Sequence, residues 1–393
     1  MTEFRDVIVL GAGLTGLAAA RKLSAQSVDS LVLEKESFPG GRLSSEEFEG
    51  CILDRGFQVI LPAYPSIRSL NLPLRLRPFS QASTCISSQG KSVLPDPIHN
   101  FKLFCSNLGS SPASISDLFR LLKHLQSRRF DISTDGLLDE LGYSNRLKND
   151  FLRPFLQGVL LDPALKSPSP LSSYFLARFF LGGAALVEGG IQEFPRAMAN
   201  DLKILFDSEV VTQEGNQVTT KDGKTFAAKI IIDTRPDIAG KGVEWLSTHC
   251  HYFLSSAPVP LEKRIVLYSS SMQTSINQVA NLSEVAPGYS PAGTALLSVT
   301  SRDFSSSDVD QLKSDLVSSL DLASSQVSHL KSIQVERAIP FASHLWPEFP
   351  EPPTPKKIES TVYASDTLSY GSQHAALRMG DRAADLAILT LKT

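Results

Sequence analysis

DVIVLGAGLTGLAAARKLSAQSVDSLVLEKESFPGGR, residues 6–42, is the stretch that decides the fold of this chain. Val7–Leu10 form a short apolar run that is typical of a buried parallel strand. Three glycines follow in the spacing G-x-G-x-x-G, and Leu17–Leu23 are rich in Ala and Leu, which favour a helix. A second strand, Ser30–Leu33, ends in the acid Glu34. Strand, turn, helix, strand and acid in this order predict a dinucleotide-binding unit.

Each glycine of the turn has a separate role in such a unit. Gly11 permits the tight turn, Gly13 lets the backbone approach a pyrophosphate, and Gly16 lets helix and strand pack closely. Leu14 and Thr15 open the helix, where unsatisfied amides and the helix dipole hold phosphate charge. Glu34 follows about 20 residues on, where an acid hydrogen-bonds the ribose of adenosine.

The residues after Glu34 indicate which dinucleotide is bound. Glu34-Lys35 is followed by Pro39-Gly40-Gly41-Arg42. A G-G-R segment at this place resembles the flavoprotein superfamily of amine oxidases, protoporphyrinogen oxidases and phytoene desaturases. The resemblance implies FAD as cofactor, with Lys35, Gly41 and Arg42 beside it and the guanidinium neutralising phosphate charge. The alternative is a glycine-rich loop with a surface arginine.

Residues 51–60, CILDRGFQVI, contain a second motif of that superfamily. Asp54 and Gly56 match its D-x-G, whose glycine backbone approaches the flavin ring, and Phe57 follows directly. Gln58 is a candidate for contact with flavin or substrate. A hairpin turn that needs glycine for a positive φ would give the same pattern.

Two later segments resemble parts of the superfamily in which the chain comes back to contact the cofactor. Val187–Ile191, VEGGI, resembles the G-G turn before a second cofactor strand, expected at Glu209–Val211. In the family a valine there offers backbone contacts to adenine, which assigns Val210. Ala228–Thr234 is a buried strand that ends at Thr234 beside the FAD.

The C-terminal motif, ASDTLSYGSQHAALRMGDRAADLAI, resembles the superfamily's final one, an acid after a strand and then a helix. The resemblance implies that Asp366 takes the ribityl hydroxyls. It also implies that Gln373, His374 and Ala375 present amides to the flavin pyrimidine near a positive helix start. Ser365 stands where most relatives have glycine. The segment contains no cysteine, so the FAD is expected to be non-covalent.

One position of this motif bears on the reaction. Amine oxidases flank the flavin with an aromatic pair, and alignment through Gly380 and Ala383-Ala384 places one member at Ser372. A serine there argues against simple amine oxidation. The desaturase and protoporphyrinogen-oxidase branches act on large apolar substrates and lack the aromatic pair.

The middle of the chain offers less specific signals. Residues 116–129, SDLFRLLKHLQSRR, place four leucines at helical spacing and four basic residues on the remaining positions. These are Leu118, Leu121, Leu122 and Leu125, and Arg120, Lys123, Arg128 and Arg129. Such a helix is either an ordinary surface helix over a core, or a lid, or a basic amphipathic helix resting on an anionic membrane.

Arg153 lies among apolar residues and needs a partner if it is buried, either a structural carboxylate or an acidic group of the substrate. Arg153, Gln58 and His374 are therefore the catalytic candidates, while the catalytic residues themselves remain unassigned. Phe175, Phe179 and Phe180 form an apolar wall that suits a core or a flavin pocket. His249 and His251 share a strand face, but no acid or cysteine pair completes a metal site, so no metal is predicted.

Composition agrees with these assignments. The chain has 393 residues, a net charge of -3 and a pI near 6.2. This overall charge does not indicate a protein that binds nucleic acid. Cys51, Cys85, Cys105 and Cys250 show no paired spacing and are expected to be reduced thiols of an intracellular protein. The first strand begins within a few residues of the N-terminus, which leaves no room for a signal peptide. A cytoplasmic or peripheral-membrane location is expected; the oligomeric state is open.

The predicted fold is α/β, with a Rossmann-type FAD-binding domain interleaved with an α+β substrate domain. We expect residues 1–63, 187–245 and 335–393 to form the FAD-binding domain, and 64–186 and 246–334 the substrate domain. The expected function is an FAD-dependent oxidoreductase that dehydrogenates or desaturates a hydrophobic small molecule by hydride transfer. The alternatives are an amine or amino-acid oxidase that produces hydrogen peroxide, and a non-catalytic flavin-binding protein.

Overall fold

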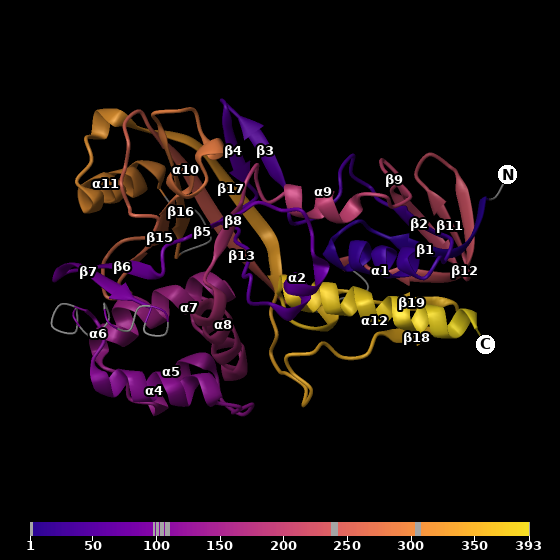
Figure 1. Ribbon diagram of the computed structural model, residues 1–393, viewed down its shortest axis with the longest axis horizontal. Helices are drawn as coiled ribbons and strands as arrows, with labels where there is room; N and C mark the ends of the chain where they lie inside the picture. Colours follow the sequence, from indigo (N-terminus) through magenta and orange to yellow (C-terminus); the bar gives the residue numbers. More distant parts are fainter. Residues whose placement is uncertain are drawn as a thin grey trace.

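The computed structural model describes residues 3–96, 99, 102, 106, 111–236, 243–302 and 308–392. Two sheets organise the molecule, one in the right-hand part of Figure 1 and one in the left-hand part. The β13 and β17 ribbons extend from the left-hand sheet toward the right-hand part. The α/β class predicted from the sequence is confirmed.

The right-hand sheet is built on the N-terminal strand. β1 (Glu3–Leu10) lies between β12 (Thr225–Asp233) and β2 (Ser30–Leu33), parallel to both. The other strands are β9 (Ile204–Leu205) beyond β2, β10 (Val210–Glu214) and β11 (Gln217–Thr220) beyond β12, and β18 (Lys356–Ile358) with β19 (Thr361–Tyr363), which joins β12 in parallel. Residues 7–10 are fully buried, as expected for a parallel strand covered on both faces.

Two long helices cover this sheet and lie side by side in Figure 1. α1 (Leu14–Ala25) follows the glycine turn, and α12 (Gln373–Leu391) ends the chain. Small residues let them approach closely: a Cβ added to Gly380 would lie 2.1 Å from the carbonyl oxygen of Thr15. α9 (Glu193–Ala199) also packs on α1, and α2 (Pro65–Leu70) on α12.

The left-hand sheet has the order β17-β13-β16-β15-β14-β6-β7. Its strands are β6 (Ala82–Ser87), β7 (Gly90–Pro95), β13 (Trp245–Ser255), β14 (Ile265–Tyr268), β15 (Ile276–Asn281), β16 (Ala295–Ser301) and β17 (Val327–Pro340). α11 (Val309–Leu320) packs Leu312 and Leu316 into an apolar cluster on one face, which also contains Phe253 of β13. α10 (Leu282–Val285) and the 3-10 turn η3 (Pro287–Tyr289) lead from β15 to β16.

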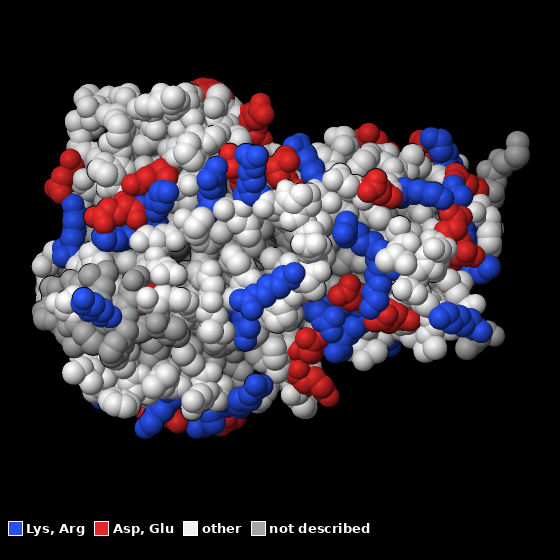
Figure 2. All heavy atoms as spheres, viewed as in Figure 1, with Lys and Arg blue, Asp and Glu red and all other residues white. Residues whose placement is uncertain are grey.

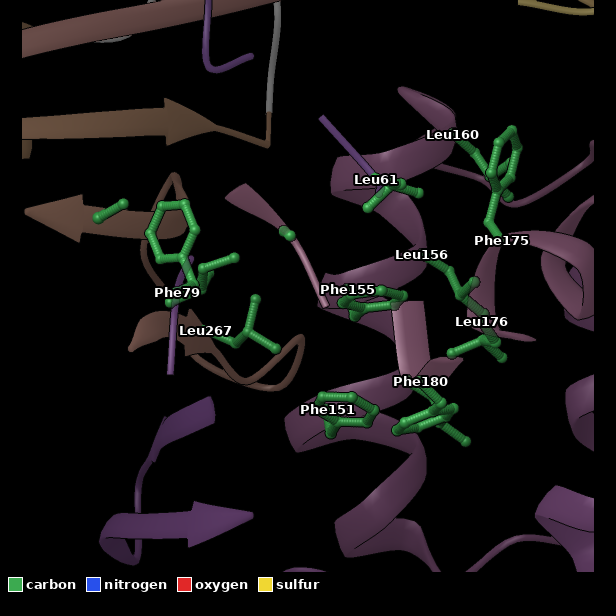
Figure 3. Close-up of a cluster of buried hydrophobic side chains, with 14 of the residues drawn as sticks. Leu61, Phe79, Phe151, Phe155, Leu156, Leu160, Phe175, Leu176, Phe180 and Leu267 are labelled. Carbon is green, nitrogen blue, oxygen red and sulfur yellow. The ribbon is translucent and has the colours of Figure 1, made fainter. Parts of the chain in front are cut away.

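A layer of helices lies below that sheet in Figure 1. It comprises α4 (Ile115–Gln126), α5 (Thr134–Glu140), α6 (Asn145–Leu147), the π-helix η1 (Lys148–Leu152), α7 (Arg153–Leu160) and α8 (Ser169–Gly182). Figure 3 shows the core between them, where Phe151 lies beside Phe180 of α8 and Leu160 beside Phe175 of α8. The expected apolar wall is therefore part of the core.

Short pairs of strands connect the two parts. β3 (Ser45–Phe48) and β4 (Cys51–Asp54) form a hairpin, and β5 (Leu76–Pro78) pairs with β8 (Ala185–Val187). The chain leaves the right-hand sheet after β2 and returns at β9, leaves again after β12 and returns at β18. This alternation supports the proposed interleaved domains.

One sequence prediction is confirmed with shifted bounds and one is corrected in detail. The strand expected at residues 209–211 is β10, which begins at Val210 and pairs with β11, while β9 is the strand that lies beside β2. The helix expected at 116–129 begins at Ile115 and ends at Gln126, and Leu122, expected among the apolar stripe, is 54% exposed. No helix in the described ranges combines the length and the apolar character needed to cross a bilayer.

Candidate functional site

The glycine turn has one open side and one closed side. Gly11 has φ +98°, which favours glycine, and Gly13 is the N-cap of α1. No side chain caps this helix and no acid lies in its first turn, where Leu14 and Thr15 stand, so the N-terminus is suited to an anion. A Cβ on Gly13 would meet no heavy atom within 4 Å, whereas one on Gly16 would lie 1.9 Å from the oxygen of Gly11.

The G-G-R segment runs along the open side. The Gly40 amide donates to the oxygen of Ala12 (2.8 Å), and Gly41, with φ +59°, lies against Gly13. The segment therefore borders the space in front of the α1 amides, where the sequence predicts the pyrophosphate.

Arg42 joins this segment to the C-terminal motif. Its Nη2 donates to Oδ2 of Asp366 (2.5 Å), and its Nη1 donates to the oxygen of Ala338 (2.8 Å). Its guanidinium also lies 5.5 Å from the ring centre of Trp245. The structure thus brings together two predicted cofactor residues that are 324 positions apart.

Glu34 is buried at the end of β2. Its carboxylate accepts hydrogen bonds from the Ala12 amide (2.5 Å) and the Glu36 amide (3.0 Å). Its carbonyl oxygen accepts from the Ser208 amide (2.7 Å), so the chain after β9 lies beside it. The Lys35 side chain is exposed, and its Nζ lies 3.5 Å from Oε1 of Glu36.

Glu34→Ala is expected to weaken FAD binding by roughly 1–3 kcal/mol, the usual scale for polar partners left unmade. Titration of the apoprotein with FAD by fluorescence measures the effect. Glu36→Ala is the matched control, because it removes a neighbouring carboxylate whose side chain is about half exposed (47%). Equal affinities for the Glu34 variant and the wild type would remove Glu34 from the site.

Asp54 of the D-x-G motif is buried and has three hydrogen-bond donors around its carboxylate. Its carboxylate accepts from Ser45 Oγ (2.7 Å), the Ile191 amide (2.9 Å) and the Tyr289 hydroxyl (2.9 Å). The sequence did not point to Tyr289, because its contact with Asp54 spans 235 positions. The three donors fix the hairpin of β4 to the G-G turn and to η3.

Gly56, two residues further, has φ +93° and receives the Tyr252 hydroxyl at its oxygen (3.3 Å). Phe57 packs edge-on against Phe79, with ring centres 6.1 Å apart. The positive φ agrees with both interpretations of the motif, a turn and a close approach to flavin.

Burial raises the pKa of Asp54 from an ordinary value near 3.8 to about 6, despite its three donors. Because the folded state binds this proton more tightly than the unfolded state, protonation of Asp54 adds to the free energy of unfolding below about pH 4. This contribution is lost as the pH rises to about 6, and the loss is on the order of 2–3 kcal/mol. Asparagine does not titrate, so only the wild type should lose this contribution over this pH range. We therefore expect the difference in unfolding free energy, Asp54→Asn minus wild type, to increase between pH 4.5 and pH 6.5 in urea titrations. A difference that stays constant with pH would contradict the raised pKa.

The C-terminal motif presents a capped helix start. Ser372 Oγ accepts from the Ala375 amide (3.0 Å), so this amide already has a partner, and its contact with a flavin stays a prediction. The Gln373 and His374 amides lie in the same first turn, which contains no acid. Three buried oxygens of the motif have no hydrogen-bond partner among the described residues. They are Thr367 Oγ1, Ser369 Oγ and Gln373 Oε1.

The side chains of the three catalytic candidates are all engaged elsewhere. Gln58 Nε2 donates to the oxygens of Arg42 (2.9 Å) and Arg55 (3.0 Å), and Arg153 pairs with Asp135 (2.5 Å). His374 is buried, with Nδ1 2.8 Å from Ser66 Oγ, and burial lowers its pKa to about 4. Each of the three side chains thus has a partner within the protein, and a role in catalysis stays a prediction.

Thr234 directly follows β12, and Val210 begins β10, two strands away in the same sheet. Thr234 Oγ1 donates to the oxygen of Leu10 (2.7 Å), so it ties the chain after β12 to the end of β1, next to the turn at Gly11. Val210 begins β10 at the edge of the sheet, paired with Thr220. Its contact with adenine stays a prediction.

The described residues contain no set of three His, Cys, Asp or Glu side chains that could hold a metal ion. His249 and His251 are buried on β13, with ring centres 4.2 Å apart and the rings tilted by 42°. Cys51, Cys85 and Cys250 are buried free thiols, and Cys105 lies outside the described residues.

These features fit FAD. The open space at Gly13, the uncapped start of α1, the buried acid Glu34 and the unpartnered oxygens at and before the start of α12 lie along segments that the sequence assigned to one dinucleotide. The residues that would hold it are Gly11, Gly13, Leu14, Thr15, Gly16, Glu34, Gly41, Arg42, Gly56, Asp366, Gln373 and His374.

Comparison with known proteins agrees with this arrangement. The family model described as flavin containing amine oxidoreductase matches residues 14–236. The chain is 30% identical to protoporphyrinogen oxidase 2 of Arabidopsis thaliana over 165 residues, which cover 39% of this chain and 32% of that protein. It is 28% identical to probable polyamine oxidase 4 of the same plant over 262 residues, 59% of this chain and 50% of that protein. The chain thus spans half or less of the length of these relatives.

A solved structure has the same fold over nearly the whole chain. It is a putrescine oxidase redesigned in its cofactor binding, with a TM-score of 0.71 at 17% identity, covering 99% of this chain and 100% of that one. Because the family model covers more than half of the residues, the resemblance inferred from the motifs is confirmed. This chain belongs to the family of flavin-containing amine oxidoreductases.

Proposed function

We propose that this protein binds FAD non-covalently and uses it to dehydrogenate or desaturate a hydrophobic small molecule. The observation that carries the proposal is Ser372, which stands at the amine oxidases' aromatic position and caps α12 instead. When bound, FAD supplies a hydride acceptor for a substrate C–H bond. The protein's own residues bind and orient the cofactor and keep water away.

The surroundings of the α12 start support an apolar substrate. Tyr174 packs against Tyr64, Tyr370 and His374, with ring centres 6.0–6.3 Å apart, so an aromatic cluster adjoins the first turn of α12. Trp346 and Phe349 extend this cluster from the Pro-rich connection. Aromatic and aliphatic walls of this kind exclude water and suit apolar ligands.

The charged residues have distinct tasks in this proposal. Arg42 offers a cation to the pyrophosphate, and Asp366 and Glu34 offer carboxylates to hydroxyl groups of the cofactor. The acid-free start of α12 gives positive potential near the flavin pyrimidine, which favours the reduced, anionic ring.

An amine oxidase is the second candidate, because the relatives include a polyamine oxidase and a putrescine oxidase. An amine oxidase would bind an ammonium group beside the flavin. The buried carboxylates Asp54 and Asp366 already have partners, the first with three donors and the second with Arg42. That favours the apolar substrate. A flavin-binding protein without catalysis is the third candidate.

Absorbance of the purified protein, followed by anaerobic addition of substrates, tests the proposal. We expect oxidised-flavin bands that bleach with an apolar polyene or a porphyrinogen and persist with small amines. Bleaching by amines with release of hydrogen peroxide would assign the second candidate. A flavin that only dithionite reduces would assign the third, and a colourless protein that cannot be reconstituted would overturn the cofactor itself.

A further inference from the structure

The outer face of α4 is apolar although it faces solvent. Ile115, Phe119 and Leu122 are 60%, 65% and 54% exposed. Their spacing of four and three residues aligns them along one side of the helix, over about 10 Å. Exposed large apolar side chains in a contiguous row mark an interaction surface rather than ordinary scatter.

The inner face of α4 is fixed to neighbouring helices by contacts that do not involve Ile115, Phe119 or Leu122. Ser114 and Asp117 form a capping box, and the Asp117 carboxylate also accepts from the Ser144 amide (2.9 Å) and hydroxyl (2.7 Å). His124 is fully buried, with its two ring nitrogens 3.2 Å from the Tyr143 hydroxyl and 2.8 Å from Ser172 Oγ. The fold therefore does not need Ile115, Phe119 or Leu122.

Basic residues flank the row. Lys123 is exposed beside it, and Arg128 and Arg129 follow the end of the helix, next to the 40%-exposed Phe130. Arg129 is engaged by Asp131 and Glu140. Figure 2 shows Lys and Arg with a few acids along the lower edge of the left-hand part, where Figure 1 places α4 and α5. The only acid on α4 itself, Asp117, is fully buried, so the exposed charge of the helix is cationic in a chain of net charge -3.

We propose that Ile115, Phe119 and Leu122 with the flanking Lys123 and Arg128, here named the α4 face, dock the protein on an anionic lipid bilayer. The apolar row would enter the boundary between headgroups and acyl chains, and the cations would meet lipid phosphates. Contact is limited to the surface, because the α4 face belongs to one helix that is anchored by its other side. The proposal does not depend on the flavin chemistry.

Charge and area favour a bilayer over a second copy of the chain. A two-fold dimer would place two copies of the same face together, and that face carries Lys123 and Arg128 but no acid that could pair with them. The three apolar side chains expose on the order of 300 Å², well below the roughly 800 Å² per partner of a stable protein interface. A lipid surface requires neither a matched shape nor a partner of that size.

Co-flotation of the purified holoprotein with vesicles tests the proposal. One set contains phosphatidylcholine alone and the other phosphatidylcholine with phosphatidylglycerol. We expect binding to the anionic vesicles that falls with added salt. The variant Ile115→Ser/Phe119→Ser/Leu122→Ser should lower the partition coefficient by about a hundredfold or more. Lys123→Gln/Arg128→Gln should lower it by about fivefold per charge and remove the salt dependence.

The matched control replaces the same number of exposed apolar residues elsewhere. Phe4, Ile358 and Leu389 are 55%, 49% and 62% exposed and belong to the right-hand part, so their triple serine variant should bind vesicles as the wild type does. Flavin content and melting temperature, measured for every variant, show whether the fold is intact. No binding of the wild type to anionic vesicles, or equal losses in both serine variants, would overturn the proposal. So would a wild-type dimer in solution that only the α4 variant dissociates, because that result would assign the face to a second copy.

Discussion

Replacing Gly13 by valine is expected to give a folded protein that no longer retains FAD. Gly13 has φ -72° and ψ 176°, an extended conformation that valine adopts readily, and no heavy atom lies within 4 Å of the added Cβ. The first atom of the new side chain therefore meets nothing in the described part of the protein. It fills the space in front of the α1 amides and would keep a pyrophosphate from approaching the backbone.

The expected loss is about 3 kcal/mol or more, on the order of a hundredfold in Kd. Flavin absorbance of the purified variant and fluorescence titration of its apoprotein measure the loss. The melting temperature of the apoprotein should match that of the wild-type apoprotein. Gly13→Ala adds one side-chain carbon, whereas valine adds three, so the alanine variant should have an intermediate Kd. A folded valine variant with full FAD would place the pyrophosphate elsewhere.

The local part of this site could be predicted from the sequence. Hydrophobic period, glycine spacing and the following acid all lie within residues 6–42, and each depends on backbone rules that act over a few residues. The structure accordingly has β1, α1 and β2 where the sequence predicts them. The Gly16 contact with the turn is also the one that the motif requires.

Contacts between distant segments could not be predicted in this way. Nothing in the sequence near Arg42 indicates that it pairs with Asp366, and nothing near Asp54 indicates Tyr289. The capping of α12 by Ser372, which occupies the Ala375 amide, depends on the backbone angles at the helix start.

Amphipathic periodicity has the same limit at α4. The spacing of its leucines predicts the helix, but it cannot say which apolar residues turn inward. The buried side is set by Asp117, Leu121 and His124 through partners on other helices, and Leu122 is left outside.

Replacing Gly16 by alanine is expected to destabilise the whole protein, in contrast to the change at Gly13. Gly16 lies in the first turn of α1, where alanine by itself would favour the helix by about 1 kcal/mol. Its Cβ would lie 1.9 Å from the carbonyl oxygen of Gly11 and 3.2 Å from Thr234 Oγ1. The oxygen belongs to the backbone of a buried turn, so α1 as a whole would have to move away from β1.

Overpacking of a core usually costs about 1–3 kcal/mol, and a clash with fixed backbone belongs at the upper end of that range. The cost should also include packing lost between α1 and α12, since a displaced α1 would also disturb the contact between Thr15 and Gly380. Urea unfolding of the apoproteins measures it without the stabilisation that bound FAD adds. Gly13→Ala is the matched control, with the same substitution three residues earlier and no atom to meet. If the Gly16 and Gly13 variants unfold at the same midpoint, the close packing of α1 on the turn is not what Gly16 provides, and its place in the motif requires another explanation.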